Sequence, residues 1–430
     1  MRPHPHSTGS TRLPLNPRLF FLTGVTPMRS PTPPWCLLVL TLGMISTGST
    51  VARAEPRQTE NVLLVTLDGL RWQEFFGGCD ESLLSKEAGG VRDVAALRRR
   101  FFRNTAEDRR DTLFPFLWKT VAAQGQIFGD PSVGSSARVT NGLFFSYPGY
   151  SEILCGFADP RIDSNDKKNN PNVTVLEWLN QKPHFAGQVA ACTSWDVFPW
   201  IINAERSGIP VDAGWQPVGP HVPPERGALL QRLADETPHL WDNVRYDSFT
   251  IQAVFDLLET RQPRVLFVSL GETDDFAHDG RYDLYLDSAL RNDRLIERLW
   301  NHLQSLPQYA GKTSLIVTTD HGRGDDRVSW KNHGKDMPIA RFVWMAVMGP
   351  DTPSLGRREN TEVTQSQVAA TVAQLLGEDY HGAVPQSAPP LPGILRGPAV
   401  SLGPAGNTDA PVRSRPRRVT TPVSPFVLRP

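Results

Sequence analysis

Short apolar runs that end in turn-forming or charged residues recur along the middle of the chain. They lie at residues 61–67, 187–192, 263–270, 314–319 and 341–348. Most are apolar throughout and do not alternate with polar residues, which is typical of strands covered on both faces. We therefore expect a largely parallel sheet.

Segments with helical periodicity separate these runs. The clearest is the recurrence of Leu295, Ile296, Leu299 and Leu303 on one helical face. Further helices are predicted at 113–121, 175–179, 249–259 and 365–376. The repeated order of strand, helix and strand predicts an α/β fold whose central, mostly parallel sheet is flanked by helices.

The segment 143–151 has a different pattern. Leu143–Phe145 is strand-like, Pro148-Gly149 indicates a sharp turn, and a helix is expected to start through Glu152. Such a turn would lift Ser146 to the mouth of the sheet. Further on, the Pro- and Gly-rich residues 205–240 are interpreted as an insertion that caps a pocket.

The N-terminal part of the chain resembles a secretory signal peptide. A short apolar run at 35–47 precedes the small-x-small pattern at 51–54, so residues 1–54 are predicted to be removed, with Met28 as an alternative start. The run is shorter than the roughly 20 residues that span a bilayer. We therefore predict a secreted or periplasmic protein without a stable membrane span.

Composition limits the remaining possibilities. Residues 55–395 are expected to form one catalytic domain, followed by a disordered Pro-rich tail at 396–430. Lys plus Arg and Asp plus Glu both number 45, and the net charge of zero indicates no surface for nucleic acid. Signal cleavage would leave Cys79, Cys155 and Cys192, of which Cys155 and Cys192 are the favoured disulfide pair because they flank the same region.

Side chains able to bind metal follow three of the predicted strands. Asp68 ends the first strand, Asp320 and His321 end the strand at 314–319, and Asp274 and His278 follow the strand at 263–270. The carboxyl ends of parallel strands meet at one edge of a sheet, where α/β folds build their sites. Carboxylate and imidazole together suit Zn²⁺ and are tolerated by Mn²⁺.

These residues divide into two groups. Asp274 and His278 share a helical face and form one site with His333, whereas Asp68, Asp320 and His321 form a second, with Ser146 between or on the metals. Each residue alone also fits an ordinary role, such as a turn carboxylate or a surface histidine. The joint pattern favours catalysis, because four separate segments deliver a ligand to the same edge.

The order of these motifs resembles the alkaline phosphatase superfamily, and within it the type I phosphodiesterase/nucleotide pyrophosphatase branch and its secreted bacterial relatives. The likeness covers residues 60–380. The strand-Asp-Gly, Asp-x-x-Gly-His and Asp-His-Gly motifs of the family correspond to 65–69, 274–278 and 320–322. Its nucleophile motif Thr-Phe-Pro-Asn corresponds to 146–149, where serine replaces threonine and glycine replaces asparagine.

The resemblance implies a three-layer sandwich and two divalent metal ions, Zn²⁺ or alternatively Mn²⁺. One ion would be held by Asp274, His278 and His333, and the other by Asp68, Asp320, His321 and the oxygen of Ser146. It also implies hydrolysis of a small phosphate ester through a phosphoseryl intermediate. Ser151 is the reserve nucleophile, and Asn165 is assigned to a phosphoryl oxygen.

Other functions remain open at this point. A phosphomutase of the same superfamily would carry a large inserted domain, and a signal peptide fits poorly with cytosolic metabolism. Sulfate-ester hydrolysis is a further alternative, although the Cys-x-Pro-x-Arg motif of the common sulfatases does not occur. A non-catalytic binding protein on this fold is disfavoured by the complete set of metal-site residues. The sequence leaves monoester or diester preference and oligomeric state open.

Overall fold

The computed structural model describes residues 57–216 and 222–396. The predicted signal peptide lies outside these ranges, as does the tail apart from Arg396. Both therefore stay predictions. None of the helices within the described ranges is long and apolar enough to cross a membrane.

An eight-stranded sheet forms the centre of the fold, with the strand order β10-β2-β9-β7-β1-β6-β4-β5. These strands are β1 (Asn61–Leu67), β2 (Gln126–Phe128), β4 (Val189–Thr193), β5 (Val211–Ala213), β6 (Val265–Leu270), β7 (Thr313–Thr318), β9 (Met345–Met348) and β10 (Gly356–Arg357). Strands β7, β1, β6, β4 and β5 run parallel to one another, whereas β9 is antiparallel to both β7 and β2. The expectation of a mostly parallel sheet is confirmed.

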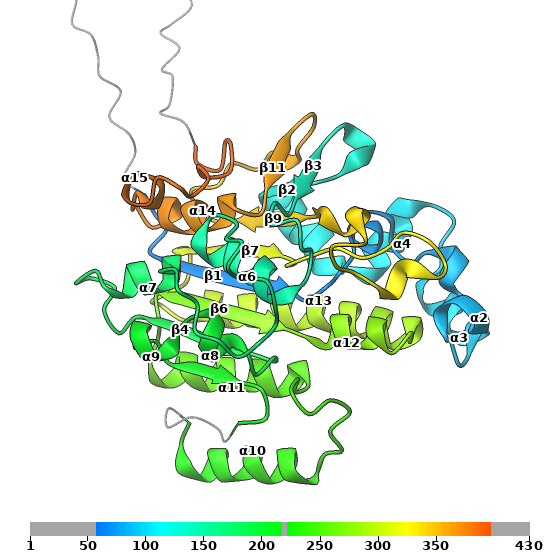
Figure 1. Cartoon of the computed structure of the whole chain (residues 1–430), viewed down its shortest axis with the longest axis horizontal. Coiled ribbons are helices and arrows are strands. Elements are labelled where there is room, and N and C mark those ends of the chain that lie inside the picture. Colours follow the sequence, from blue (N-terminus) through cyan, green and yellow to red (C-terminus); the bar gives the residue numbers. More distant parts are fainter. Residues whose placement is uncertain (1–56, 217–221, 397–430) are drawn as a thin grey trace, which may run out of the picture. The chain divides into compact units, whose positions relative to one another are not determined.

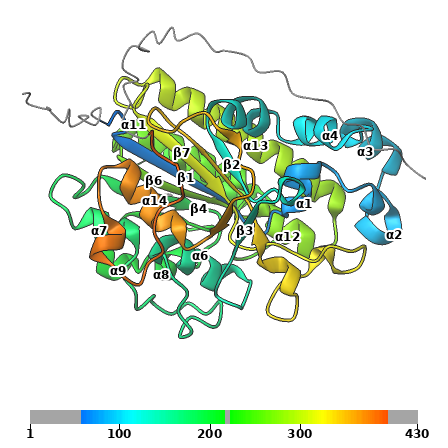
Figure 2. The same cartoon turned by 90° about the horizontal axis from the view of Figure 1, so that it is seen from above.

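Helices cover both faces of this sheet (Figures 1 and 2). The helices most relevant to the site and the layers are α1 (Trp72–Gly77), α4 (Ala106–Leu113), α6 (Ser146–Cys155), α7 (Val175–Asn180), α8 (Phe198–Ile201), α11 (Asp247–Thr260), α12 (Glu272–His278), α13 (Tyr282–Ser305) and α14 (Gln367–Leu375). Shorter or peripheral helices are α2 (Lys86–Gly89), α3 (Val94–Phe101), α5 (Ala122–Gln124), α9 (Ala204–Ser207), α10 (Pro224–Glu236) and α15 (Tyr380–Ala383). The expected arrangement of three layers, a central sheet between two layers of helices, is therefore confirmed.

Strand β1 shows why the sheet is buried on both sides. Leu63, Val65 and Leu67 pack with α1, α11 and α13, while Val62 and Leu64 point into the opposite core with α6, α7 and α14. All seven residues of β1 are buried. Each such Val or Leu stabilises the fold by about 1.5–3 kcal/mol, which explains the continuous apolar runs in the sequence.

The last predicted strand, at 341–348, divides between two sheets. Strand β8 (Phe342–Val343) belongs to a small sheet with β3 (Ser136–Arg138) and β11 (Glu362–Thr364), whereas β9 joins the large one. Trp344 lies between the two strands, fully buried, and its indole Nε1 donates to the carbonyl of Leu70 at 3.1 Å. A single strand was therefore the wrong prediction.

The prediction for 143–151 is correct for the helix through Glu152 but wrong for the rest, because no strand precedes this helix and no turn occurs at Pro148-Gly149. Helix α6 begins at Ser146, which places Pro148 in its first turn. Proline is tolerated there because the first N–H groups of a helix have no intrahelical acceptor. Gly149 is required by close packing: a Cβ at this position would lie 2.5 Å from the carbonyl oxygen of Asp320.

The proposed Cys155–Cys192 disulfide is contradicted, since Cys79, Cys155 and Cys192 are all free and buried. Cys192 on β4 points into the core formed with α11 and α13. Cys155 ends α6 in the layer on the other side of the sheet, near the side chains of Ser151 and Asn170. The sheet therefore separates the two sulfur atoms.

Candidate active site

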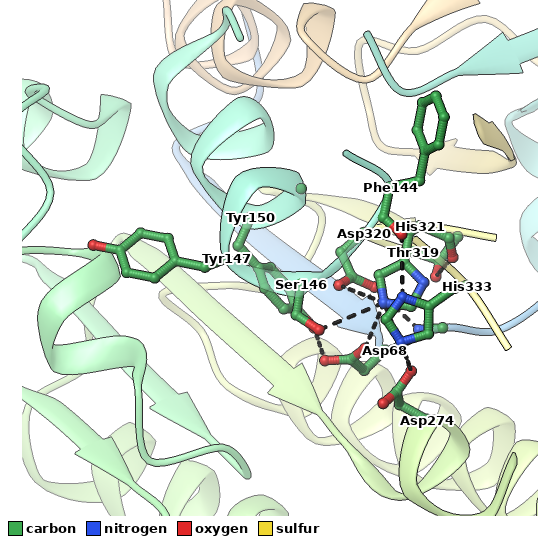
Figure 3. Close-up of polar contacts among 12 residues, drawn as sticks. Asp68, Phe144, Ser146, Tyr147, Tyr150, Asp274, Thr319, Asp320, His321 and His333 are labelled. Atoms are coloured by element: carbon green, nitrogen blue, oxygen red, sulfur yellow. Dashed lines mark hydrogen bonds and ion pairs between the residues drawn. The ribbon is translucent and has the colours of Figure 1, made fainter. Parts of the chain in front are cut away.

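Three adjacent strands bring the predicted metal ligands together. β7, β1 and β6 are neighbours in the sheet, and Asp320, Asp68 and helix α12 follow their carboxyl ends. Figure 3 shows Asp68, Asp274, Asp320, His321 and His333 converging beside Ser146 at the start of α6. The topology thus delivers residues from distant parts of the sequence to one edge of the sheet.

The first ligand group is Asp68, Asp320 and His321, all buried. The Nε2 atom of His321 lies 3.5 Å from Oδ1 of Asp68 and 3.4 Å from Oδ2 of Asp320. Both of these carboxylate oxygens are buried without a hydrogen-bond partner in the described structure. Because an unsatisfied buried carboxylate oxygen is costly, this arrangement fits a cation between the three side chains.

The second group contains Asp274, His278 and His333. Nε2 of His278 lies 3.1 Å from Oδ2 of Asp274 and 2.9 Å from Nε2 of His333, while Nε2 of His333 is 3.8 Å from Oδ1 of Asp274. His321 also approaches this group, with its Nε2 3.6 Å from Oδ1 of Asp274. All of the ligands proposed from the sequence therefore lie in one cluster. The side chains close enough to share one ion are Asp274, His321 and His333 in one group and Asp68, Asp320 and His321 in the other, and His278 lies beside the first of these groups.

Electrostatics within the cluster favour a bound cation. Burial, together with Asp320 and Asp274, raises the pKa of Asp68 well above its usual range, and burial raises that of Asp320 to about 8. Burial also lowers the pKa of His333 to about 4 and that of His321 well below its usual range. Neutral imidazoles beside crowded carboxylates form a donor set suited to zinc or manganese.

Backbone carbonyls orient both buried histidines. His321 donates from Nδ1 to the carbonyl of Gly322 at 3.0 Å, and His333 donates from Nδ1 to the carbonyl of Phe144 at 3.1 Å. A carbonyl only accepts, so the proton resides on Nδ1 and Nε2 carries a free lone pair. This is the arrangement that metal-binding histidines require.

Arg323 is a residue of the cluster that the sequence analysis did not identify. Its guanidinium is fully buried, forms an ion pair with Asp274, and donates to the carbonyl of Gly69 at 3.1 Å. Although burial acts to raise the pKa of Asp274, Arg323 and His278 hold it well below its usual range. The only signal in the sequence was an arginine two residues after His321.

Further contacts fix the carboxylates. The hydroxyl of Tyr150 donates to Oδ2 of Asp68 at 2.9 Å, and the backbone N–H of Gly69 donates to Oδ1 of Asp320 at 3.0 Å. Gly69 has φ +59°, and a Cβ there would lie 2.5 Å from Oδ1 of Asp274. Glycine is therefore needed for both the backbone conformation and the close approach of two ligands.

Ser146 is the first residue of α6, and its Oγ lies 3.5 Å from Nε2 of His321. The reserve candidate, Ser151, is directed elsewhere: its Oγ accepts from Nδ2 of Asn170 at 3.2 Å and lies 3.8 Å from Sγ of Cys155. The geometry thus favours Ser146 as the nucleophile.

A cleft of about 120 Å³ opens over this centre. Its lining includes Ser146, the ligands Asp68 and Asp274, the carboxylate of Asp275, and the amides of Asn165 and Asn243. Asn165 accepts from the backbone N–H of Tyr147 at 2.9 Å, which anchors its side chain at the rim. The described part of 205–240 does not line this cleft. Its residues 214–216, 230, 231 and 234 line a different pocket.

Two features of the cleft were not foreseen from the sequence. Within the described ranges, no lysine or arginine lines it. Asp275 adds a third acidic side chain, which forms no hydrogen bond or ion pair with the described residues. Burial and the charge of Asp274 raise its pKa to about 8. A substrate at Ser146 would therefore lie beside a carboxyl group that forms no ion pair, although the charge of Arg323 acts to lower the pKa of that group.

Comparisons with known proteins agree with this geometry. The family model of type I phosphodiesterase/nucleotide pyrophosphatase matches residues 155–341, which include Asp274, His278, Asp320, His321 and His333 but not Asp68 or Ser146. No curated protein matches the chain significantly.

Among solved structures, wild-type alkaline phosphatase PafA aligns over 80% of this chain and 100% of that chain, with a TM-score of 0.52 and 12% identity. Murine ectonucleotide pyrophosphatase/phosphodiesterase 5 aligns over 77% of this chain and 96% of that one, with a TM-score of 0.46 and 13% identity. The likeness to PafA supports the fold. Over residues 155–341, which contain five of the proposed ligands, the chain is similar to the type I phosphodiesterase/nucleotide pyrophosphatase family.

Proposed function

We propose that the protein hydrolyses phosphodiesters at a two-metal centre, with Ser146 as the nucleophile. The observation that carries this proposal is the convergence of two ligand groups on the Ser146 hydroxyl, with buried oxygens of Asp68 and Asp320 left without partners. A non-catalytic binding protein would have no evident use for a serine held against both groups.

The residues fit two divalent ions, for which Zn²⁺ is our first choice and Mn²⁺ the alternative. Asp274, His278 and His333 would hold one, with His321 also close to Asp274. Asp68, Asp320, His321 and the Ser146 oxygen would hold the other. When bound, such ions supply Lewis acidity that favours the ionised serine and offsets charge on the departing oxygen.

The chain's own groups support a double displacement. Oγ of Ser146 loses its proton and bonds to phosphorus while the bond from phosphorus to the leaving alcohol breaks, and that alcohol takes up a proton from solvent. Water then attacks the phosphoseryl group, the bond from phosphorus to Oγ breaks, and the hydroxyl is restored. Asn165, anchored by the N–H of Tyr147, would donate its amide to a phosphoryl oxygen.

The cleft favours diesters over monoesters. A phosphomonoester dianion carries one more negative charge than a diester monoanion and is commonly paired with lysine or arginine. In the described structure none of these lines the cleft, and above its pKa of about 8 the side chain of Asp275 adds a further negative charge. Both features disfavour the dianion.

The phosphomutase alternative loses support from the topology. The residues between Ser151 and Asp274 that the structure describes contribute β4, β5 and β6 to the main sheet, with helices packed around them. They therefore supply no inserted domain of the kind expected for that alternative.

The test is a paired assay of the zinc- or manganese-loaded protein on bis-p-nitrophenyl phosphate and p-nitrophenyl phosphate. We expect faster turnover of the diester and a loss on the order of 10³-fold or more in Ser146→Ala, with bound metal retained. Ser151→Ala is the matched control and should stay close to wild type. Faster turnover of the monoester would contradict the proposed diester preference. Wild-type turnover in Ser146→Ala would show that Ser146 is not the nucleophile.

A further inference from the structure

Phe144 has an unusual backbone conformation two residues before the nucleophile, with φ +53°. The other non-glycine residues with positive φ among those described are Asn203, Gln262 and Asn360. Asparagine reaches this region readily because its short polar side chain bonds locally, whereas a bulky aromatic residue does not. Strain of this kind persists only where the surroundings enforce it, and it concentrates at functional sites.

The surrounding loop enforces the conformation. Oδ1 of Asn141 accepts from the backbone N–H groups of Leu143 at 2.8 Å and Phe144 at 3.0 Å. The buried carboxylate of Glu152, on α6, accepts in turn from the backbone N–H groups of Thr140 and Asn141 at 3.0 Å. The loop is thus tied both to itself and to the helix that carries Ser146.

The carbonyl of Phe144 receives the Nδ1 proton of His333 at 3.1 Å (Figure 3). The His333 ring stacks on that of His321, with centroids 3.9 Å apart and an interplanar angle of 17°. With Nδ1 occupied in this way, Nε2 points at Nε2 of His278, 2.9 Å away. The orientation of one carbonyl therefore determines which nitrogen of His333 faces the metal centre.

We propose that the left-handed backbone of Phe144 is a positioning device. It aims the carbonyl at His333, fixes the Nδ1–H tautomer and ring orientation of this ligand, and links the segment leading to Ser146 with the metal centre. The proposal rests on the metal-binding part of the proposed function and not on the identity of the substrate. Phe144 is a positioning residue, because it acts through His333.

A substitution series separates this role from simple packing. Glycine adopts positive φ without cost, alanine with some cost, and the β-branched valine and isoleucine least readily. If backbone conformation matters, zinc affinity should rank Phe144→Gly at or above wild type, then Phe144→Ala, then Phe144→Val and Phe144→Ile. Phe144 also packs against the core beside α6, so a packing role would reverse this order and make glycine the worst.

The primary measurement is zinc affinity by competition with a chelator, without substrate. We expect Phe144→Val and Phe144→Ile to lose about 10–100-fold, the range typical when the orienting partner of a metal ligand is disturbed. The matched control is Gln262→Ile, which imposes the same backbone conflict at the opposite end of β6. It should lower the free energy of unfolding without changing zinc affinity.

A second readout uses metal-free protein, labelled with ¹⁵N in histidine and assigned through His333→Gln. Nitrogen shifts should report Nδ1–H at His333 in wild type and Phe144→Gly, and a shift toward Nε2–H in Phe144→Ile. Affinities that follow side-chain size, or an unchanged tautomer in Phe144→Ile, would overturn the proposal. If the protein does not hydrolyse diesters but the zinc affinities of the Phe144 variants follow the expected order, the proposed function is wrong and the positioning role of Phe144 is supported.

Discussion

Charge is distributed unevenly among the side chains of the site. Asp68, Asp274 and Asp320, the proposed metal ligands, crowd together, and buried Arg323 forms an ion pair with Asp274 alone among them. Asp275 is different, since it faces the cleft without taking part in either ligand group. Its charge should therefore act on the substrate as well as on the neighbouring carboxylates of Asp274 and Asp68.

Asp275→Asn tests that role. At pH 9, above the pKa of about 8, the wild-type side chain is ionised and repels a phosphomonoester dianion more than a diester monoanion. The ratio of monoester to diester kcat/KM should rise roughly 3- to 10-fold in the variant, corresponding to about 1 kcal/mol. Asp279→Asn, just beyond α12, is the control and should leave this ratio at the wild-type value. An unchanged ratio in Asp275→Asn would show that the residue does not select substrate.

Much of the site could be predicted from the sequence, because ligands placed directly after apolar strands are positioned by local chain geometry alone. The roles of Arg323, Tyr150 and Phe144 could not. Tyr150 bonds Asp68 across a gap of 82 positions, and Phe144 acts through its backbone conformation. Neither a hydrogen bond between distant residues nor a backbone conformation produces a recognisable pattern in the neighbouring sequence.

Individual elements show the same division between local and tertiary causes. Strands β1, β6 and β7 were predicted because burial on both faces demands continuous apolar runs. Helix α6 was misread because Pro148-Gly149 is a common turn signal. Here the glycine meets a tertiary requirement, the close approach of the helix to the carbonyl of Asp320.

Helix α13 contains a buried carboxylate with a testable pH dependence. Asp293 accepts from the backbone N–H groups of Phe116 and Leu117, both at 2.9 Å, and burial raises its pKa to about 7 from 3.8. Between about pH 4 and pH 7 the folded protein holds a proton that the unfolded chain has released. The contribution of this group to stability is therefore full below pH 4 and decreases as pH rises to 7.

Urea unfolding of wild type and Asp293→Asn at pH 5 and pH 8, both with EDTA, measures this effect. The difference in unfolding free energy, wild type minus variant, should fall by roughly 2 kcal/mol between these values. Titrations of the site carboxylates are common to both proteins and cancel. A difference that is constant or rises with pH would show that Asp293 does not titrate as described.

For the whole molecule, metal binding and folding should be coupled. A cation that binds the folded centre and not the unfolded chain raises the melting temperature with concentration. Asp320→Asn tests this coupling at a single ligand. The variant removes a charge from a crowded, buried cluster but keeps an oxygen that accepts from the N–H of Gly69.

Asp320→Asn should therefore change the melting temperature in opposite directions in metal-free and zinc-loaded protein. Without metal at pH 9, Asp320→Asn should melt at a higher temperature than wild type, and with saturating zinc at a lower one. Destabilisation in both states would indicate a purely structural role for Asp320. A higher melting temperature of Asp320→Asn both with and without zinc would show that Asp320 is not a metal ligand.

The proposed mechanism depends most directly on covalent transfer of the phosphoryl group to Ser146. The decisive measurement is peptide mass spectrometry of metal-loaded protein, quenched in acid while it turns over bis-p-nitrophenyl phosphate. We predict a p-nitrophenylphosphoryl adduct on Ser146. An adduct on Ser151 or another residue, or undiminished turnover in Ser146→Ala, would contradict the proposed mechanism.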